Sequence, residues 1–388
     1  MKRVSVASAG YGSLALLLAA LAMATTLRQS GWSITALPHV DSRTVLGAAS
    51  RTIDPTFDAV HPGAYDGQFY WGIAIDPLAT GKLHRGFDKP SYRYGHPLYG
   101  WLAWLLSFGT ARAVPSALAA LGLASMFAAA FAAAALGISR GTRGWEGLLV
   151  AVSPGLIFAV RGDLAEPLGV ALLLGGLAAH SRDRRRLAWI CFALLPLAKE
   201  PLILATLSVI AWELLRHRWR SAAVFATALA PALTWWTWAR IHLGAWFTSG
   251  GSALAPPFAG WRQSIEQNLA GHSALVAHVH AGRLTAAALI ALLVLVVFVG
   301  VCALRLRGPL DLATLAFAVL AICLAGNATM AFASALRNTA FLFVLAPFVV
   351  GRRQFARPPT AHRITRVSSM PASLVASSTS AADSLSKR

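Results

Sequence analysis

Long apolar segments separated by short, arginine-rich loops are the feature that most limits what this chain can fold into. The apolar segments are residues 11–27, 113–136, 145–160, 168–179, 187–198, 202–215, 222–243, 284–304, 310–325 and 340–350. A helix needs roughly 20 mostly apolar residues to cross the hydrocarbon core, whereas a membrane barrel would show short alternating segments. The sequence therefore predicts an all-α polytopic membrane protein with about ten transmembrane helices.

Composition and charge agree with this class. Of the 388 residues, 56% are hydrophobic and 13% are charged, which is far from the usage of a soluble domain. The net charge of +19 would suggest a nucleic-acid partner in a soluble protein. Here the basic residues fall largely in the loops between apolar segments, as the positive-inside rule describes. We therefore expect contact with membrane lipid and no nucleic-acid partner.

The orientation of the chain is predicted from its first residues. Lys2 and Arg3 precede the first apolar segment, which keeps the N-terminus in the cytoplasm and delivers the next segment to the outside. Residues 22–24, Ala-Met-Ala, also resemble a signal-peptidase site. The first segment is thus either an uncleaved anchor, which the polytopic remainder favours, or a cleaved signal.

The first outer loop is the longest polar stretch ahead of the tail. Residues 28–112 include this extracytoplasmic loop and, at 97–108, an apolar segment that is too short to span and suits a helix at the membrane interface. Loops of this length are usually functional or disordered, and the aromatic residues argue against disorder. Residues 1–351 are predicted to form one membrane domain, and residues 352–388 a disordered, basic cytoplasmic tail.

Within this loop, the stretch AYDGQFYWGIAIDP at residues 64–77 places Asp66 among aromatic residues. A carboxylate in apolar surroundings has a raised pKa and suits a general base. Alternatively, Asp66 caps a short helix, a position that Asp also favours. The following stretch, SYRYGHPLYGWLAW, adds Arg93 and His96 and favours the functional interpretation.

Other outer-face charges could hold an anionic ligand. The candidate cations are Arg93, Arg161, Lys199, Arg283 and Arg337. Lys199 and Glu200 lie between two prolines and form either a ligand-binding pair or a self-neutralised pair.

A second acidic pair, Asp163 and Glu166, lies in RGDLAEP. It would orient an acceptor, bind a divalent cation or pair with Arg161. The histidines in GHSALVAHVHAG lack a nearby Cys or acidic residue, so no metal site is predicted there. Walker and nucleophile-elbow motifs are absent from the sequence.

The outer-loop YDGQFY, the following DP, the segment PSYRYGHPLY and the polytopic helical body resemble the GT-C superfamily of bacterial integral-membrane glycosyltransferases, in particular its mannosyltransferase-like branch. The resemblance implies a polyprenyl-phosphate-linked sugar as donor, and a glycan, glycolipid or protein as acceptor. It also implies an active site facing the outside of the bacterial cytoplasmic membrane. No cofactor is required, although a divalent cation is possible.

The resemblance assigns the catalytic role to Asp66. The predicted substrate-binding residues are Tyr65, Gln68, Tyr70, Arg93, His96, Asp163, Glu166, Lys199, Glu200 and Arg337. A phosphate leaving group needs no second acid, so one base is enough and the anomeric configuration is inverted. The alternatives are a transporter or flippase of lipid-linked saccharides, with charges lining an inner cavity, and an assembly factor in which Asp66 is dispensable.

Overall fold

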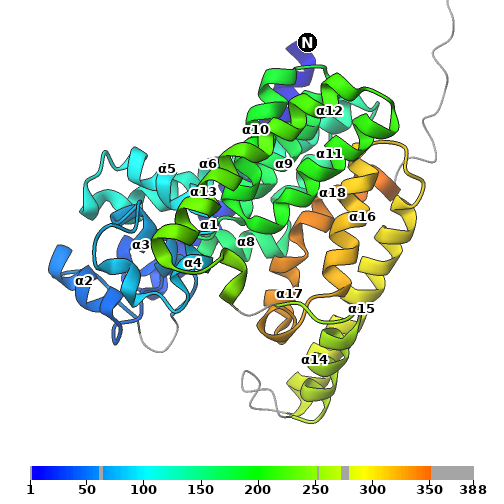
Figure 1. Ribbon diagram of the computed structural model, residues 1–388. Coiled ribbons are helices and arrows are strands. Elements are labelled where there is room, and N and C mark those ends of the chain that lie inside the picture. Colours follow the sequence, from blue (N-terminus) through cyan, green and yellow to red (C-terminus); the bar gives the residue numbers. More distant parts are fainter. Residues whose placement is uncertain (1, 61–63, 251–252, 272–278, 351–388) are drawn as a thin grey trace, which may run out of the picture. The chain divides into compact units, whose positions relative to one another are not determined.

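The computed structural model describes residues 2–60, 64–250, 253–271 and 279–350 (Figure 1). Within these residues the chain is all-helical, with isolated β-bridges in place of strands. The all-α prediction is therefore confirmed for the part of the chain that is described. The predicted tail at 352–388 lies outside it, as do His272 and His278 of the histidine-rich stretch.

The helices are mostly short. Those of the first half are α1 Lys2–Gln29, α2 Val45–Ile53, α3 Gly67–Ile75, α4 Pro90–Arg93, α5 Leu98–Leu106, α6 Val114–Ser139, α7 Glu146–Ala151, α8 Pro154–Arg161 and α9 Glu166–Ser181. Those of the second half are α10 Arg185–Ala198, α11 Ile203–Leu215, α12 Trp219–Ala226, α13 Ala230–Leu243, α14 Ala259–Leu269, α15 Val279–Ala303, α16 Pro309–Ile322, α17 Phe332–Asn338 and α18 Ala340–Val350.

Among the described residues, few helices are long and apolar enough to cross a membrane. Three qualify: Val6–Gln29, Ala111–Ser139 and Ala281–Ala303. A fourth is possible by length if α17 and α18, which are bent by 61° relative to each other, are counted as one span. These helices indicate a membrane protein. The prediction of about ten spans is wrong, because most of the predicted apolar segments form helices that are too short or are broken.

Proline explains two of the breaks. Residues 145–160, predicted as one span, form α7 and α8, because Ser153 before Pro154 is extended, with ψ at 114°. Residues 222–243 likewise divide into α12 and α13, with Pro231 in the first turn of α13.

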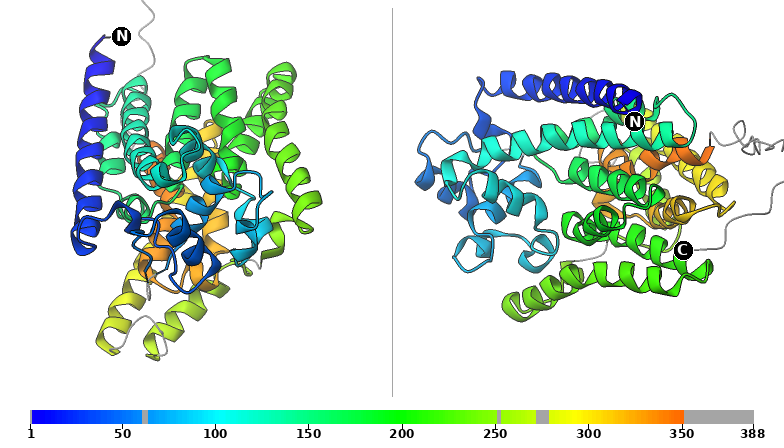
Figure 2. Two further views of the ribbon diagram at one scale, coloured as in Figure 1. Left: turned by 90° about the vertical axis from the view of Figure 1, so that its left-hand side faces the viewer. Right: turned by 90° about the horizontal axis from the view of Figure 1, so that it is seen from above.

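The core is built on close contacts between neighbouring long helices. Helix α1 packs along α6, α6 along α9, and α9 along α10 (Figure 2). The buried face of α6 is rich in alanine, including Ala129, Ala130, Ala133 and Ala134. Small side chains let helix backbones approach closely, which explains why this helix can pack on several neighbours.

The first outer loop is folded. The predicted interfacial helix at 97–108 is present as α5, which packs against α3 and α6. Two hydrogen bonds hold the turn after α3: Tyr94 Oη donates to the Asp76 carbonyl at 2.6 Å, and Trp101 Nε1 donates to the Pro77 carbonyl at 2.8 Å. The aromatic residues of this loop therefore fix its backbone.

Candidate functional site

Asp66 lies at the centre of a cluster of charged side chains. It occupies the N-cap position of α3, yet its carboxylate makes no capping hydrogen bond. Instead Oδ1 accepts a hydrogen bond from Arg93 Nη1 at 3.0 Å, and Oδ2 accepts one from Arg337 Nη1 at 2.9 Å. The helix-capping interpretation is therefore wrong for this side chain, which is held between two arginines.

Gly67 sets the position of Asp66. A Cβ atom at Gly67 would overlap the carbonyl oxygen of Gly162 and lie 2.9 Å from that of Pro38. Only glycine lets the start of α3 approach the turn between α8 and α9 so closely. This contact brings the outer loop against the helix that carries Glu166.

Glu166 opens α9 and is the second carboxylate of the cluster. Its Oε1 forms an ion pair with Lys199 Nζ and lies 3.4 Å from Arg337 Nε. Arg337 therefore bridges Asp66 and Glu166. The alternative in which Glu166 pairs with Arg161 is wrong, because Arg161 Nε donates to Thr26 Oγ1 at 2.9 Å.

Glu200 is the third carboxylate. Its Oε2 lies 2.9 Å from His96 Nδ1, so Lys199 and Glu200 each pair with a residue elsewhere in the chain and not with each other. The self-neutralised interpretation of Lys199 and Glu200 is thereby excluded. The His96 ring also makes edge contacts with Tyr70 and Tyr92, at centroid distances of 5.9 and 5.3 Å.

Aromatic rings flank the two arginines. The Arg93 guanidinium lies 3.8 Å from the centroid of Phe69, and that of Arg337 lies 5.2 Å from the centroid of Tyr65. Arg93 also donates from Nε and Nη2 to the two carboxylate oxygens of Asp88, at 2.9 and 3.0 Å. Neither Phe69 nor Asp88 was predicted as a partner of Arg93, although Asp88 precedes Arg93 by only five positions.

Two predicted residues do not join the cluster. Gln68 Oε1 accepts a hydrogen bond from the Asp41 backbone N–H at 3.3 Å and so holds the beginning of the outer loop. Asp163 is fully buried, and its carboxylate finds no hydrogen-bond partner among the described residues. Burial raises the pKa of Asp163 well above its ordinary value. The alternative in which Asp163 pairs with Arg161 is also wrong.

The cations determine the protonation of the clustered carboxylates. Burial alone raises the pKa of Asp66, but Arg337 and Arg93 outweigh it and the pKa is lowered. The raised pKa predicted from the aromatic surroundings is therefore wrong. Burial also opposes ionisation of Glu200, yet the neighbouring His96 side chain holds the pKa of Glu200 at about 2. Both groups are carboxylates at neutral pH.

A cavity of about 320 Å³ adjoins the cluster. Lys199, Glu200 and Tyr92 contribute polar groups to its lining. Its apolar lining includes Phe317 and Leu320 from α16, and Phe341 and Leu342 from α18. Tyr92 was not predicted as a lining residue; its place beside Arg93 in the stretch SYRYGHPLYGWLAW is the signal that could have found it.

The described residues include no group of three or more His, Cys, Asp and Glu side chains that could hold a metal ion. Each carboxylate of the cluster faces a nitrogen of Arg, Lys or His. The expectation that no cofactor is required, with a divalent cation allowed, is untested by this arrangement.

Fold and site define a helical membrane protein in which a compact cluster of alternating charges adjoins a largely apolar cavity. Models of protein families, curated proteins and solved structures contain no match to this chain. What the site does is therefore inferred from its own chemistry.

Proposed function

We propose that the protein is an inverting glycosyltransferase that moves a sugar from a polyprenyl phosphate to an acceptor on the extracytoplasmic face of the bacterial cytoplasmic membrane. The acceptor is a polysaccharide, a glycolipid or a protein. The single observation that carries the proposal is a carboxylate, Asp66, held by Arg93 and Arg337 in a charged cluster. Two other members of that cluster, Lys199 and Glu200, line a cavity with largely apolar walls.

The donor has two chemical parts, and the site offers a counterpart to each. An isoprenoid chain suits the apolar walls formed by α16 and α18. The phosphate suits Lys199, which lines the cavity, and the arginines Arg337 and Arg93 of the same charged cluster. Charged donors bind phosphate oxygens strongly, and arginine does so with two parallel hydrogen bonds. A volume of about 320 Å³ lies within the usual range of ligand sites.

These cations would also favour the reaction itself. The phosphate of the donor is a diester, and the leaving polyprenyl phosphate is a monoester that carries more negative charge. Fixed positive groups stabilise charge that develops in the transition state. The leaving group therefore needs no protonation by a second carboxylic acid.

Asp66 is the best placed of the three carboxylates to act as the base. Its side chain is 31% exposed, compared with 2% for Glu166 and 19% for Glu200. In the proposed step the acceptor oxygen bonds to the anomeric carbon, the bond from that carbon to the phosphate oxygen breaks, and the acceptor proton passes to Asp66. Attack from the face opposite the phosphate inverts the configuration.

Donor binding would also prepare this base. The two arginines lower the pKa of Asp66 in the free protein, which makes its carboxylate a weak proton acceptor. When an arginine turns toward the donor phosphate, it withdraws a hydrogen bond from Asp66 and the pKa rises. The carboxylate thus becomes more basic when the donor is present.

The proposal is tested with purified protein in lipid nanodiscs, given polyprenyl-phosphate sugars and candidate acceptors. We expect a new glycosidic bond of inverted configuration, read by NMR of the anomeric proton. Retained configuration would contradict the single-base mechanism. Movement of intact lipid-linked saccharide across the bilayer without cleavage would support the transporter alternative and contradict the proposal.

Two tryptophan substitutions test whether the lipid chain of the donor binds in the cavity. Leu320 lines the cavity, whereas its neighbour Val319 does not line it and is 52% exposed. Leu320→Trp would fill the cavity and raise the KM for the donor on the order of tenfold, while Val319→Trp leaves it within about twofold. Equal KM values for the two variants would place the lipid chain elsewhere.

A further inference from the structure

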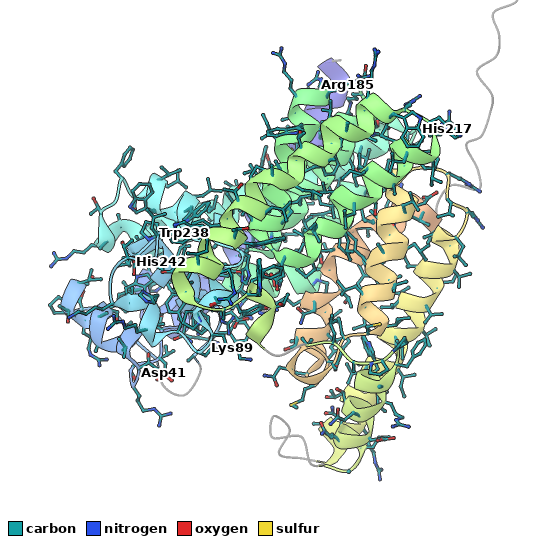
Figure 3. All side chains as sticks on the ribbon, in the orientation of Figure 1. Asp41, Lys89, Arg185, His217, Trp238 and His242 are labelled. Atoms are coloured by element: carbon teal, nitrogen blue, oxygen red, sulfur yellow. The ribbon has the colours of Figure 1, made fainter. Side chains whose placement is uncertain are left out.

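Two arginine-rich turns come together away from the charged cluster. One joins α9 to α10 and the other joins α11 to α12. Figure 3 shows Arg185 and His217, which mark these turns, at one end of the helices, and Lys89 and Asp41 in the region of the outer loop. The two turns line a common hollow of about 910 Å³, which we call the basic hollow; its residues include Arg185, Arg218, Arg220 and Ser221.

The arginines of the basic hollow are weakly engaged within the protein. Arg185 Nε lies 2.9 Å from Asp183 Oδ1, but both side chains are more than 60% exposed, and such surface pairs contribute little. Arg218 Nη1 lies 3.9 Å from Glu213 Oε1, an oxygen that already pairs with His180 Nε2 at 3.1 Å. Nearly all of the arginine hydrogen-bonding capacity is therefore available to a ligand.

Arg220 adds a third guanidinium to the basic hollow. No carboxylate within ion-pair distance of it is found among the residues that the structure describes. The hollow thus contains more positive than negative groups, with Arg185, Arg218 and Arg220 set against Asp183 and the nearby Glu213.

We propose that the basic hollow binds a phosphate group. Arginine presents a planar set of N–H donors that matches phosphate oxygens, and three such groups on two turns can surround one phosphate. Trp219, also in the lining, is 64% exposed, and tryptophan is enriched at the level of lipid headgroups. This position favours the headgroup of an anionic phospholipid over a phosphate compound from solution.

The positive-inside rule explains why these loops contain arginines. It does not explain why arginines from two different turns line the same hollow. If the hollow is a specific site, lipid binding depends on which arginines are removed. If general positive charge is the cause, removal of any three exposed arginines has the same effect on lipid binding. This difference is the basis of the test, which needs no transfer activity and is independent of the proposed glycosyltransferase function.

The test measures lipids retained by the purified full-length protein. The protein is reconstituted in nanodiscs of phosphatidylcholine with a minor fraction of phosphatidylglycerol, and bound lipid is then counted by native mass spectrometry. The site variant is R185Q/R218Q/R220Q. The control R43Q/R51Q/R262Q removes the same charge from exposed arginines outside the basic hollow. Equal melting temperatures establish that each variant is folded, and R185K/R218K/R220K is used if the site variant does not fold.

The proposal predicts that the wild-type protein and the control retain phosphatidylglycerol in preference to phosphatidylcholine. The site variant should lose that preference by roughly tenfold or more. For R185K/R218K/R220K we expect a partial loss of the preference for phosphatidylglycerol. The lysines keep the positive charge but lack the paired N–H donors of arginine. Equal losses in the site variant and the control, or no preference in the wild-type protein, would overturn the proposal.

A second arm separates the two sources of phosphate. Inorganic phosphate and glycerol phosphate are titrated into the same samples at constant ionic strength, with sulfate-free chloride buffer as the reference. Displacement of the lipid by millimolar phosphate would support a shared phosphate site. Binding of free phosphate by a protein with no lipid preference would overturn the headgroup assignment.

Discussion

Arg337 Nη1 donates a hydrogen bond to Asp66 Oδ2 at 2.9 Å, although 271 positions separate the two residues in the sequence. The same guanidinium reaches Glu166 Oε1 through Nε, at 3.4 Å. One side chain from α17 therefore ties the outer loop to the start of α9. The side chains of Arg337 and Glu166 are only 12% and 2% exposed, so water cannot readily replace the lost partner when Arg337 is removed.

Arg337→Gln should lower the free energy of unfolding by roughly 1–3 kcal/mol, because two carboxylates lose a charged donor. Thermal unfolding in detergent would measure this. Arg262→Gln is the control, since Arg262 is 79% exposed and faces Glu266 at 3.7 Å on the surface of α14. A change of the same size in both variants would show that Arg337 contributes no more than a surface ion pair.

The ion pair between Lys199 and Glu166 should couple strongly. In a double-mutant cycle with Lys199→Met and Glu166→Gln, we expect a coupling free energy of roughly 1–3 kcal/mol, because both side chains are largely buried. The matched cycle with Arg185→Met and Asp183→Asn should give less than about 0.5 kcal/mol, because that pair is exposed. Similar values for the two cycles would contradict the buried charged cluster.

Acid should weaken the contact between Glu200 and His96. The pKa of Glu200 is lowered from its ordinary 4.5 to about 2, against the effect of burial and with His96 as the main cause. A group with a depressed pKa stabilises the folded state fully above its unfolded pKa, here about 4.5, and loses that contribution as the pH falls through its folded pKa, here about 2.

The difference in melting temperature between wild-type protein and Glu200→Gln should therefore shrink as the pH falls from about 4.5 to about 2. Differential scanning fluorimetry across that range would measure it. A difference that grows toward low pH would show that Glu200 has a raised pKa, contrary to the account.

The approach of α3 to the turn before α9 should depend on Gly67. Gly67→Ala places a methyl group against the backbone oxygens of Gly162 and Pro38, so the Asp66 carboxylate is displaced and activity falls at least tenfold. Gly175→Ala, in α9, meets only Cys191 Sγ at 3.8 Å and should be tolerated. Loss of activity in both variants, or in neither, would argue against a specific role of this backbone contact.

The sequence predicted which residues belong to the charged cluster, but it did not predict which of them form ion pairs with each other. Asp66, Arg93, His96, Glu166, Lys199, Glu200 and Arg337 were all candidates, and the structure brings them together. Neighbouring charges suggested local pairs, however, whereas the observed partners come from distant segments. Ion pairing depends on tertiary contacts such as that of Gly67 with Gly162, which no local pattern reveals.

Helix type was also predictable, but helix length was not. Apolar composition and the absence of alternating segments identified an all-α membrane protein. Prolines break the apolar segments at points that a hydropathy profile does not show. Ser153, for example, is extended because Pro154 follows it, and the helix is interrupted there. A count of apolar segments therefore overestimated the number of spans.

The central claim, that Asp66 is the base of a glycosyl transfer, is tested most directly by the rate of sugar transfer in Asp66→Asn. Asp88→Asn is the matched control, because Asp88 also binds Arg93 but is 47% exposed and makes no contact with Arg337 that the structure records. The account predicts a loss of roughly 10²–10⁴-fold in kcat for Asp66→Asn and less than about tenfold for Asp88→Asn, with both proteins folded. Full transfer activity in Asp66→Asn would contradict it.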